Sequence, residues 1–191
     1  MQSNPASTPS TPTIDPQVMK LMNQQVALTR QVNGGASWFG FVGVFSLINS
    51  LAYLIFGGGI TFLVGLGLTQ LVDGVAKGLI KSGMSPDILS GVALLIDVAV
   101  AAVFVIFNIF GRRRQSWAFI IGMAVYVLDM LIFIVLIFVG SSSNKMGLIL
   151  PAGFHVLALF GMFRGLMSVN KLAEVEGKLN NMTAPGSTPM P

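Results

Sequence analysis

Two aspartates and the only histidine of the chain lie within long apolar stretches, where ionisable side chains are rare. Asp97 and Asp129 lie near the middle of two stretches, and Asn49 and His155 lie within two others. A charged group there costs about 2.5–3.5 kcal/mol on insertion scales, and such groups mark ion paths, proton relays or buried pairs. A histidine that titrates near neutrality beside two carboxylates is typical of a proton or cation relay. The same groups also hydrogen-bond helices to one another.

The stretches that carry these residues are each long enough to cross a membrane as a helix. About twenty residues are needed to span a hydrocarbon core about 30 Å thick. We expect spans over residues 38–56, 88–111, 116–140 and 147–168. Charged residues make up 9% of the chain and hydrophobic residues 53%, whereas soluble domains contain about 25% charged residues. The composition therefore predicts an all-α integral membrane protein, built as a four-span helix bundle.

The four polar residues lie at one depth when each span is counted from its non-cytoplasmic end. At about 1.5 Å per residue, Asn49 lies roughly 10 Å deep, His155 about 12 Å, Asp97 about 13 Å and Asp129 about 15 Å. Small and polar residues share one face of every span, and such faces turn toward other helices. We therefore predict an intramembrane polar cluster of Asn49, Asp97, Asp129 and His155. We favour a role in helix packing over an ion relay.

The segment over residues 60–84 is the ambiguous part of the topology. Gln70, Asp73, Lys77 and Lys81 recur at helical spacing opposite an apolar face, a pattern typical of a helix that lies in the membrane interface. We expect an interfacial amphipathic or shallow re-entrant helix between the first and second spans. A five-span protein, in which this segment crosses, is the alternative.

The distribution of basic residues favours four spans. Without a crossing at 60–84, one side holds eight basic residues and the other holds three: Lys20, Arg30, Arg112, Arg113, Arg114, Arg164, Lys171 and Lys178 against Lys77, Lys81 and Lys145. With a crossing, the same residues divide five to six. Cytoplasmic loops carry the excess of basic residues. We therefore expect a multi-pass protein of the cell membrane with both termini in the cytoplasm.

The segments outside the bundle differ from it in composition. Residues 1–15 and 183–191 are rich in Pro, Ser and Thr and are predicted to be disordered tails. Residues 16–33 predict a short amphipathic surface helix, which the Asn33-Gly34-Gly35 sequence should end. The bundle then occupies residues 36–172, and the last helix continues into the cytoplasm over 173–182.

Residues with expected packing or lipid roles form two groups. Small residues at helical spacing predict close helix packing at Gly161, Gly165, Ala118 and Gly122, and Gly161-x-x-x-Gly165 also fits a self-association motif. Basic residues near the membrane surface are expected at lipid headgroups: Arg112, Arg113, Arg114, Arg164, Lys77 and Lys81. Because the positive charges lie at span ends, the net charge of +4 does not predict nucleic-acid binding.

The sequence contains no recognisable catalytic motif. Cysteine is absent, which excludes disulfides, thiolate catalysis and cysteine metal sites, and one histidine would need both aspartates to build a common zinc site. We predict no enzyme activity, no cofactor and no metal. The expected function is a structural or interaction component of a membrane assembly, in contact with the lipid bilayer and with itself or another membrane protein. The alternative is a small oligomeric proton or cation channel or transporter that uses Asp97, Asp129 and His155; an enzyme that acts on lipid ranks third.

Overall fold

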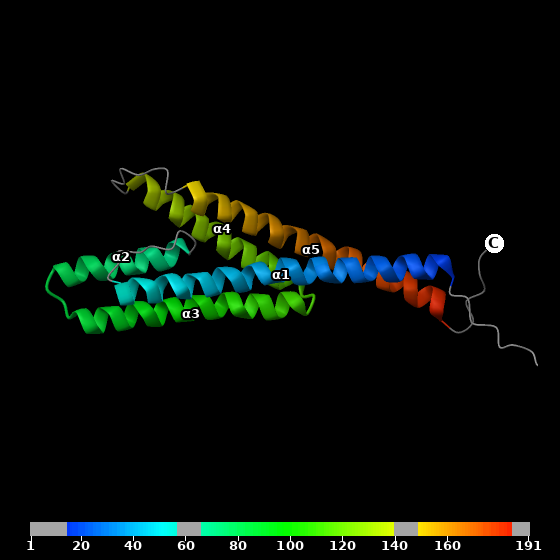
Figure 1. The fold of residues 1–191 in the computed structure, drawn as a ribbon, viewed down its shortest axis with the longest axis horizontal. Coiled ribbons are helices and arrows are strands. Elements are labelled where there is room, and N and C mark those ends of the chain that lie inside the picture. Colours follow the sequence, from blue (N-terminus) through cyan, green and yellow to red (C-terminus); the bar gives the residue numbers. More distant parts are fainter. Residues whose placement is uncertain (1–14, 57–65, 140–148, 185–191) are drawn as a thin grey trace, which may run out of the picture.

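The computed structural model describes residues 15–56, 66–139 and 149–184, and the regular elements within these ranges are all helices. Figure 1 shows their arrangement. Their bounds are α1 (Pro16–Phe56), α2 (Gly67–Lys81), α3 (Pro86–Arg112), α4 (Ser116–Val139) and α5 (Ile149–Thr183). Four of them, all except α2, are long and apolar enough to cross a membrane. The prediction of an all-helical chain with four such helices is confirmed. The predicted tails lie almost entirely outside the described residues.

Helices α1, α3, α4 and α5 alternate in direction along the long axis of the molecule (Figure 1). Gly40 of α1 lies against Asn108 of α3, and Ala36 lies against Gly111, so α1 and α3 are antiparallel. The chain therefore leaves α1 and enters α3 at the same end of the bundle. The segment between them, which includes α2, makes no net crossing.

Local sequence explains where the helices begin and turn. The Asp15 carboxylate accepts a hydrogen bond from the Gln17 N–H at 2.7 Å, and Pro16 occupies the first helical position, which suits its fixed φ angle. Helix α3 likewise begins at Pro86, directly after Ser85. The tight turn between α3 and α4 places Arg114 at a positive φ of 63°.

The predicted helix break at residues 33–35 is wrong, because α1 is one continuous helix of 41 residues. A glycine inside a helix costs only about 1 kcal/mol, and here one of the two glycines allows a close helix crossing. A Cβ atom on Gly35 would lie 2.5 Å from the Cα atom of Gly165 in α5, whereas a Cβ on Gly34 would meet nothing within 4 Å. Gly35 therefore permits α1 and α5 to touch.

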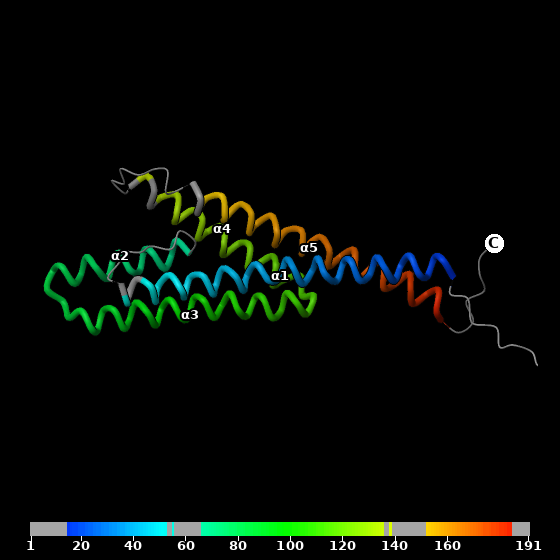
Figure 2. The backbone as a smooth tube through the Cα atoms, in the orientation of Figure 1, coloured from blue at the N-terminus to red at the C-terminus, as the bar shows by residue number. Residues whose placement is uncertain are grey.

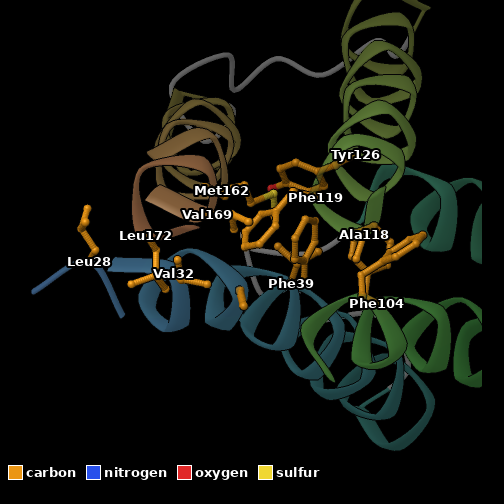
Figure 3. Packing of buried hydrophobic residues seen from close by; sticks show 14 of the residues in the cluster. Leu28, Val32, Phe39, Phe104, Ala118, Phe119, Tyr126, Met162, Val169 and Leu172 are labelled. Carbon is orange, nitrogen blue, oxygen red and sulfur yellow. The ribbon is translucent and has the colours of Figure 1, made fainter. Parts of the chain in front are cut away.

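The apolar core lies where α1, α3, α4 and α5 meet. Phe39 of α1 lies at its centre, with ring centroids 5.8 Å from those of Phe107 and Phe119 and 6.5 Å from that of Phe104. Figure 3 shows Phe39, Phe104 and Phe119 close to Tyr126. This layer of phenylalanines fixes the relative positions of the helices on the side of the bundle where α3 turns into α4.

Two helices continue past that turn as a pair, which we call the stalk: residues 16–35 of α1 and 165–183 of α5. Figure 2 shows both continuing beyond α3 and α4. At 1.5 Å per residue each arm is about 30 Å long. The apolar core of the bundle continues between the two arms through Leu28, Val32, Val169, Leu172 and Val175, four of which Figure 3 labels. The stalk includes the predicted helical extension over 173–182.

Polar contacts connect the two arms of the stalk and attach them to the bundle. Glu176 accepts hydrogen bonds from the Gln25 side chain at 3.0 Å and from Arg114 at 2.6 Å. These contacts hold the pKa of Glu176 below its ordinary value of 4.5, with the Gln25 hydrogen bond the largest cause. The Ser168 hydroxyl oxygen lies 2.8 Å from the Gln31 Oε1 atom.

Candidate functional site

The first turn of α2 is buried inside the bundle, and a carboxylate of α4 binds it there. The Asp129 Oδ2 atom accepts a hydrogen bond from the Gly67 N–H at 3.0 Å, and Oδ1 accepts one from the Leu68 N–H at 2.9 Å. No side chain of α2 caps its own N-terminus. Because the first N–H groups of a helix lack partners within the helix, Asp129 supplies the cap. Its negative charge also interacts favourably with the positive end of the helix dipole.

The residues on both sides of this cap complete the hydrogen bonding of the buried turn. The Leu66 N–H donates to the Ser46 hydroxyl oxygen of α1 at 3.0 Å, and the Thr69 hydroxyl donates to the Leu66 carbonyl at 2.8 Å. Gly67 has no room for a side chain, since a Cβ there would lie 2.9 Å from the Asp129 carbonyl oxygen. Helices α1 and α4 therefore hold the start of α2 between them.

His155 of α5 completes this group. Its Nε2 atom lies 3.4 Å from the Asp129 Oδ2 atom, and both side chains are buried, with 1% and 5% of their surface exposed. The imidazole ring stacks between Tyr126 and Phe133, with centroid distances of 5.1 and 5.2 Å. Asp129 and His155 are thus fixed by aromatic stacking and by the α2 backbone, an arrangement that suits helix packing.

Asp97, another member of the predicted cluster, lies beside Ser50 where α3 packs against α1, and Asn49 is buried one residue before Ser50 on α1. Asp97 is 1% exposed, and the Ser50 hydroxyl lies beside it close enough for a weak polar interaction, but the contact does not reach the geometry of a full hydrogen bond. Among the described residues, the buried side-chain polar atoms that lack a partner are four oxygens: Asn49 Oδ1, Ser50 Oγ, and Asp97 Oδ1 and Oδ2. The predicted cluster is therefore two groups, one fully bonded and one with unpaired oxygens.

Comparison with known proteins gives no match to a protein-family model, to a curated protein or to a solved structure. The interpretation of the site therefore rests on its geometry. Within residues 15–56, 66–139 and 149–184, no three His, Cys, Asp or Glu side chains lie close enough together to hold a metal ion.

The small residues predicted to pack helices lie at contacts within the chain. A Cβ on Gly161 would overlap the Trp38 indole, and one on Gly165 would lie 2.7 Å from the Phe119 ring. A Cβ on Gly122 would lie 2.5 Å from the Phe39 ring, and Ala118 is fully buried. Residues of α1 and α4 of the same chain therefore lie against the Gly161–Gly165 face of α5, which agrees with the predicted role of these glycines in close helix packing.

The arginines predicted at lipid headgroups gather at the α3–α4 turn and at the base of the stalk. Arg112 donates to Asn108 and Ser37, and the Arg113 guanidinium lies 5.6 Å from the Phe110 ring centre. Arg114 pairs with Glu176, and Arg164 lies 5.8 Å from the Phe160 ring centre. Lys77 and Lys81, which were also predicted at lipid headgroups, lie toward the other end of the bundle, on the exposed side of α2.

Sequence reasoning did not predict that Ser46, Leu66 and Gly67 belong to the site. Ser46 lies on the same small and polar face of α1 as Asn49, and this position could have predicted that Ser46 faces the interior of the bundle. Leu66 and Gly67 take part in the site through their backbone N–H groups. The types of their side chains give no indication of such hydrogen bonds. Their role depends on the unexpected depth at which α2 begins.

Proposed function

We propose that the chain is a four-span protein of the cell membrane with both termini in the cytoplasm. Large apolar side chains on the outside of the bundle support lipid as its surroundings, among them Phe138 at 84% and Leu95 at 69% exposure. Asp97, Asp129 and His155 are buried between the helices, as polar groups in spans should be. The arginines at the α3–α4 turn mark the cytoplasmic side, in agreement with the positive-inside rule.

In this arrangement α2 is a re-entrant helix rather than an interfacial one. It lies lengthwise beside α3 (Figure 1), and its start is buried at the level of Asp129 and Ser46. Non-helical backbone is tolerated at membrane depth only where protein or a water-filled cavity surrounds it. The hydrogen bonds that Asp129 and Ser46 accept from this backbone satisfy that condition.

Within this framework the proposed function is that of a structural or interaction component of a membrane assembly. The stalk is the observation that carries this proposal. A bundle that only spans the bilayer has no need for two helices that continue about 30 Å beyond it. The apolar core continues into the stalk, and Glu176 connects its two arms, so it presents a rigid surface to a cytoplasmic partner or to a second copy.

We infer that a partner binds the exposed face of the α1 arm. Met19, Met22 and Val26 recur at helical spacing, and each is about half exposed. Methionines adapt their shape to different partners and are frequent at binding surfaces. Asn23 and Gln24, also exposed, provide neighbouring polar positions for control substitutions.

Native electrophoresis after extraction in a mild detergent tests this proposal. The wild-type chain should migrate as a particle larger than one chain with its detergent, and Met22→Lys should migrate as a smaller one. Asn23→Lys introduces the same charge one residue away and should leave the large particle intact. A wild-type particle of single-chain size, or one that Met22→Lys leaves unchanged, would contradict the proposal.

Ion conduction past Asp97, Asp129 and His155 is the less supported alternative. Asp129 is bound to the α2 backbone, and His155 is held between two aromatic rings. Between this level and the α3–α4 turn lies the packed phenylalanine layer around Phe39. A path for ions toward the cytoplasm would have to open this layer.

A further inference from the structure

We propose that Asp97, Asn49 and Ser50 form a binding site for a small monovalent cation such as Na⁺, at the junction of α1, α2 and α3. The inference goes beyond the proposed interaction function and does not depend on it. It assigns a ligand to the one group of buried polar atoms in the described residues that the fold leaves without hydrogen bonds.

The chemistry of these atoms is the first argument. All four unpaired atoms are oxygens, and they come from a carboxylate, an amide and a hydroxyl. Buried polar atoms are nearly always paired, and each exception requires an explanation such as a bound water or ion. Oxygen atoms that include one carboxylate are the ligands that hard cations prefer. A site with a single buried carboxylate suits one positive charge, because Ca²⁺ and Mg²⁺ favour sites that supply more negative charge.

The positions of the residues are the second argument. Asn49 and Ser50 lie three and four residues after Ser46, so all three side chains share one face of α1. Ser46 on that face contacts the start of α2, and Ser50 lies beside Asp97 of α3. The Ser50 and Asp97 oxygens therefore lie together between α1 and α3, and Asn49 shares the face of α1 that carries Ser46 and Ser50.

Electrostatics is the third argument. A buried carboxylate without a partner is unfavourable, and a counter-charge removes much of that cost. Asp73 of α2 lies close enough for the Asp97 charge to act on it, so the two carboxylates repel each other across the contact between α2 and α3. A cation bound between Asp97 and the neutral oxygens would relieve the repulsion and hold α2 against α3.

Thermal unfolding of the purified full chain in detergent tests the site. NaCl and choline chloride are compared at constant pH and equal ionic strength. A ligand that binds only the folded state raises stability with the logarithm of its concentration. The melting temperature of the wild type should therefore be higher in NaCl and should rise with Na⁺ concentration. Asp97→Asn should show no difference between the salts, and in choline chloride it should melt no lower than the wild type, because it removes an unpaired charge.

Two further variants keep the test decisive. Asp87→Asn makes the same change at an exposed position of the same helix and should keep the full Na⁺ response. Ser50→Ala retains the carboxylate but removes one oxygen, so the Na⁺ concentration for half of the effect should rise several-fold. A wild-type melting temperature that is equal in the two salts would overturn the proposal. So would a full Na⁺ response in Asp97→Asn or, if that variant does not fold, an unchanged half-effect concentration in Ser50→Ala.

Discussion

The Asp129 carboxylate of α4 lies 3.0 Å from the backbone nitrogen of Gly67, a residue 62 positions earlier in the chain, and caps the first turn of α2 there. Capping groups usually come from the residue next to the helix, as Asp15 does for α1. Here a different helix provides the cap, so the position of α2 depends on the packing of α4. This contact explains how a helix can begin in the middle of an apolar bundle.

Replacing Asp129 should destabilise the fold through this cap. Asp129→Ala leaves the N–H groups of Gly67 and Leu68 buried without acceptors, at a cost of about 1–3 kcal/mol for each unsatisfied group. Asp129→Asn retains one acceptor oxygen and should cost less. Thermal unfolding in detergent measures both, with Asp87→Ala as an exposed control. Equal stability of Asp129→Ala and the control would show that the cap contributes nothing.

The two neighbouring glycines of α1 should respond in opposite ways to alanine. Gly35→Ala places a Cβ against the α5 backbone at Gly165, so the stalk must separate and the unfolding temperature should fall. Gly34→Ala meets no neighbour and should stabilise the chain by about 0.5–1 kcal/mol through helix propensity. Thermal unfolding of the two variants gives the sign directly. A loss of stability in both would mean that the close crossing at Gly35 is not specific.

The Glu176 contacts should make the stalk sensitive to acid. The pKa of Glu176 is lowered in the folded chain by Gln25 and Arg114, so its stabilising contribution is present above the ordinary pKa of 4.5. That contribution is lost as pH falls through the lower, folded-state value. A partly exposed ion pair of this kind contributes at most about 1 kcal/mol. Limited proteolysis of the stalk between pH 6 and pH 3 should show this loosening.

Two variants separate this effect from general acid damage. Glu176→Gln should be cleaved at pH 6 nearly as fast as the wild type is at low pH. Glu174→Gln, which removes only the exposed pair with Lys178, should behave like the wild type. Equal cleavage rates for the wild type, Glu176→Gln and Glu174→Gln would show that Glu176 does not hold the stalk together.

The long apolar helices were predictable because a stretch of twenty apolar residues has few alternatives to a spanning helix. The depth count also placed Asn49, Asp97, Asp129 and His155 within the buried interior. Depth does not specify direction around the bundle axis, however. For that reason the structure brings Asp129 and His155 together but places Asp97 beside Ser50.

The other differences come from contacts between distant segments. Asn33-Gly34-Gly35 has the local composition of a helix end, but packing of Gly35 against Gly165 outweighs that local preference. The amphipathic pattern of residues 60–84 does not reveal that α2 begins inside the bundle. The acceptors that allow this, Asp129 and Ser46, lie on other helices.

Single cysteines at three positions test the proposed topology most directly, since the chain has no cysteine of its own. Gln24 lies in the stalk, Asp87 precedes most of α3 and Gln115 lies in the α3–α4 turn. In intact cells, a membrane-impermeant maleimide should label Asp87→Cys, and should label Gln24→Cys and Gln115→Cys only after the cells are permeabilised. Labelling of Gln115→Cys in intact cells, with both Gln24→Cys and Asp87→Cys protected, would mean that the α2 segment crosses the membrane and would contradict the four-span arrangement. Labelling of Gln24→Cys together with Gln115→Cys would instead contradict the proposed orientation.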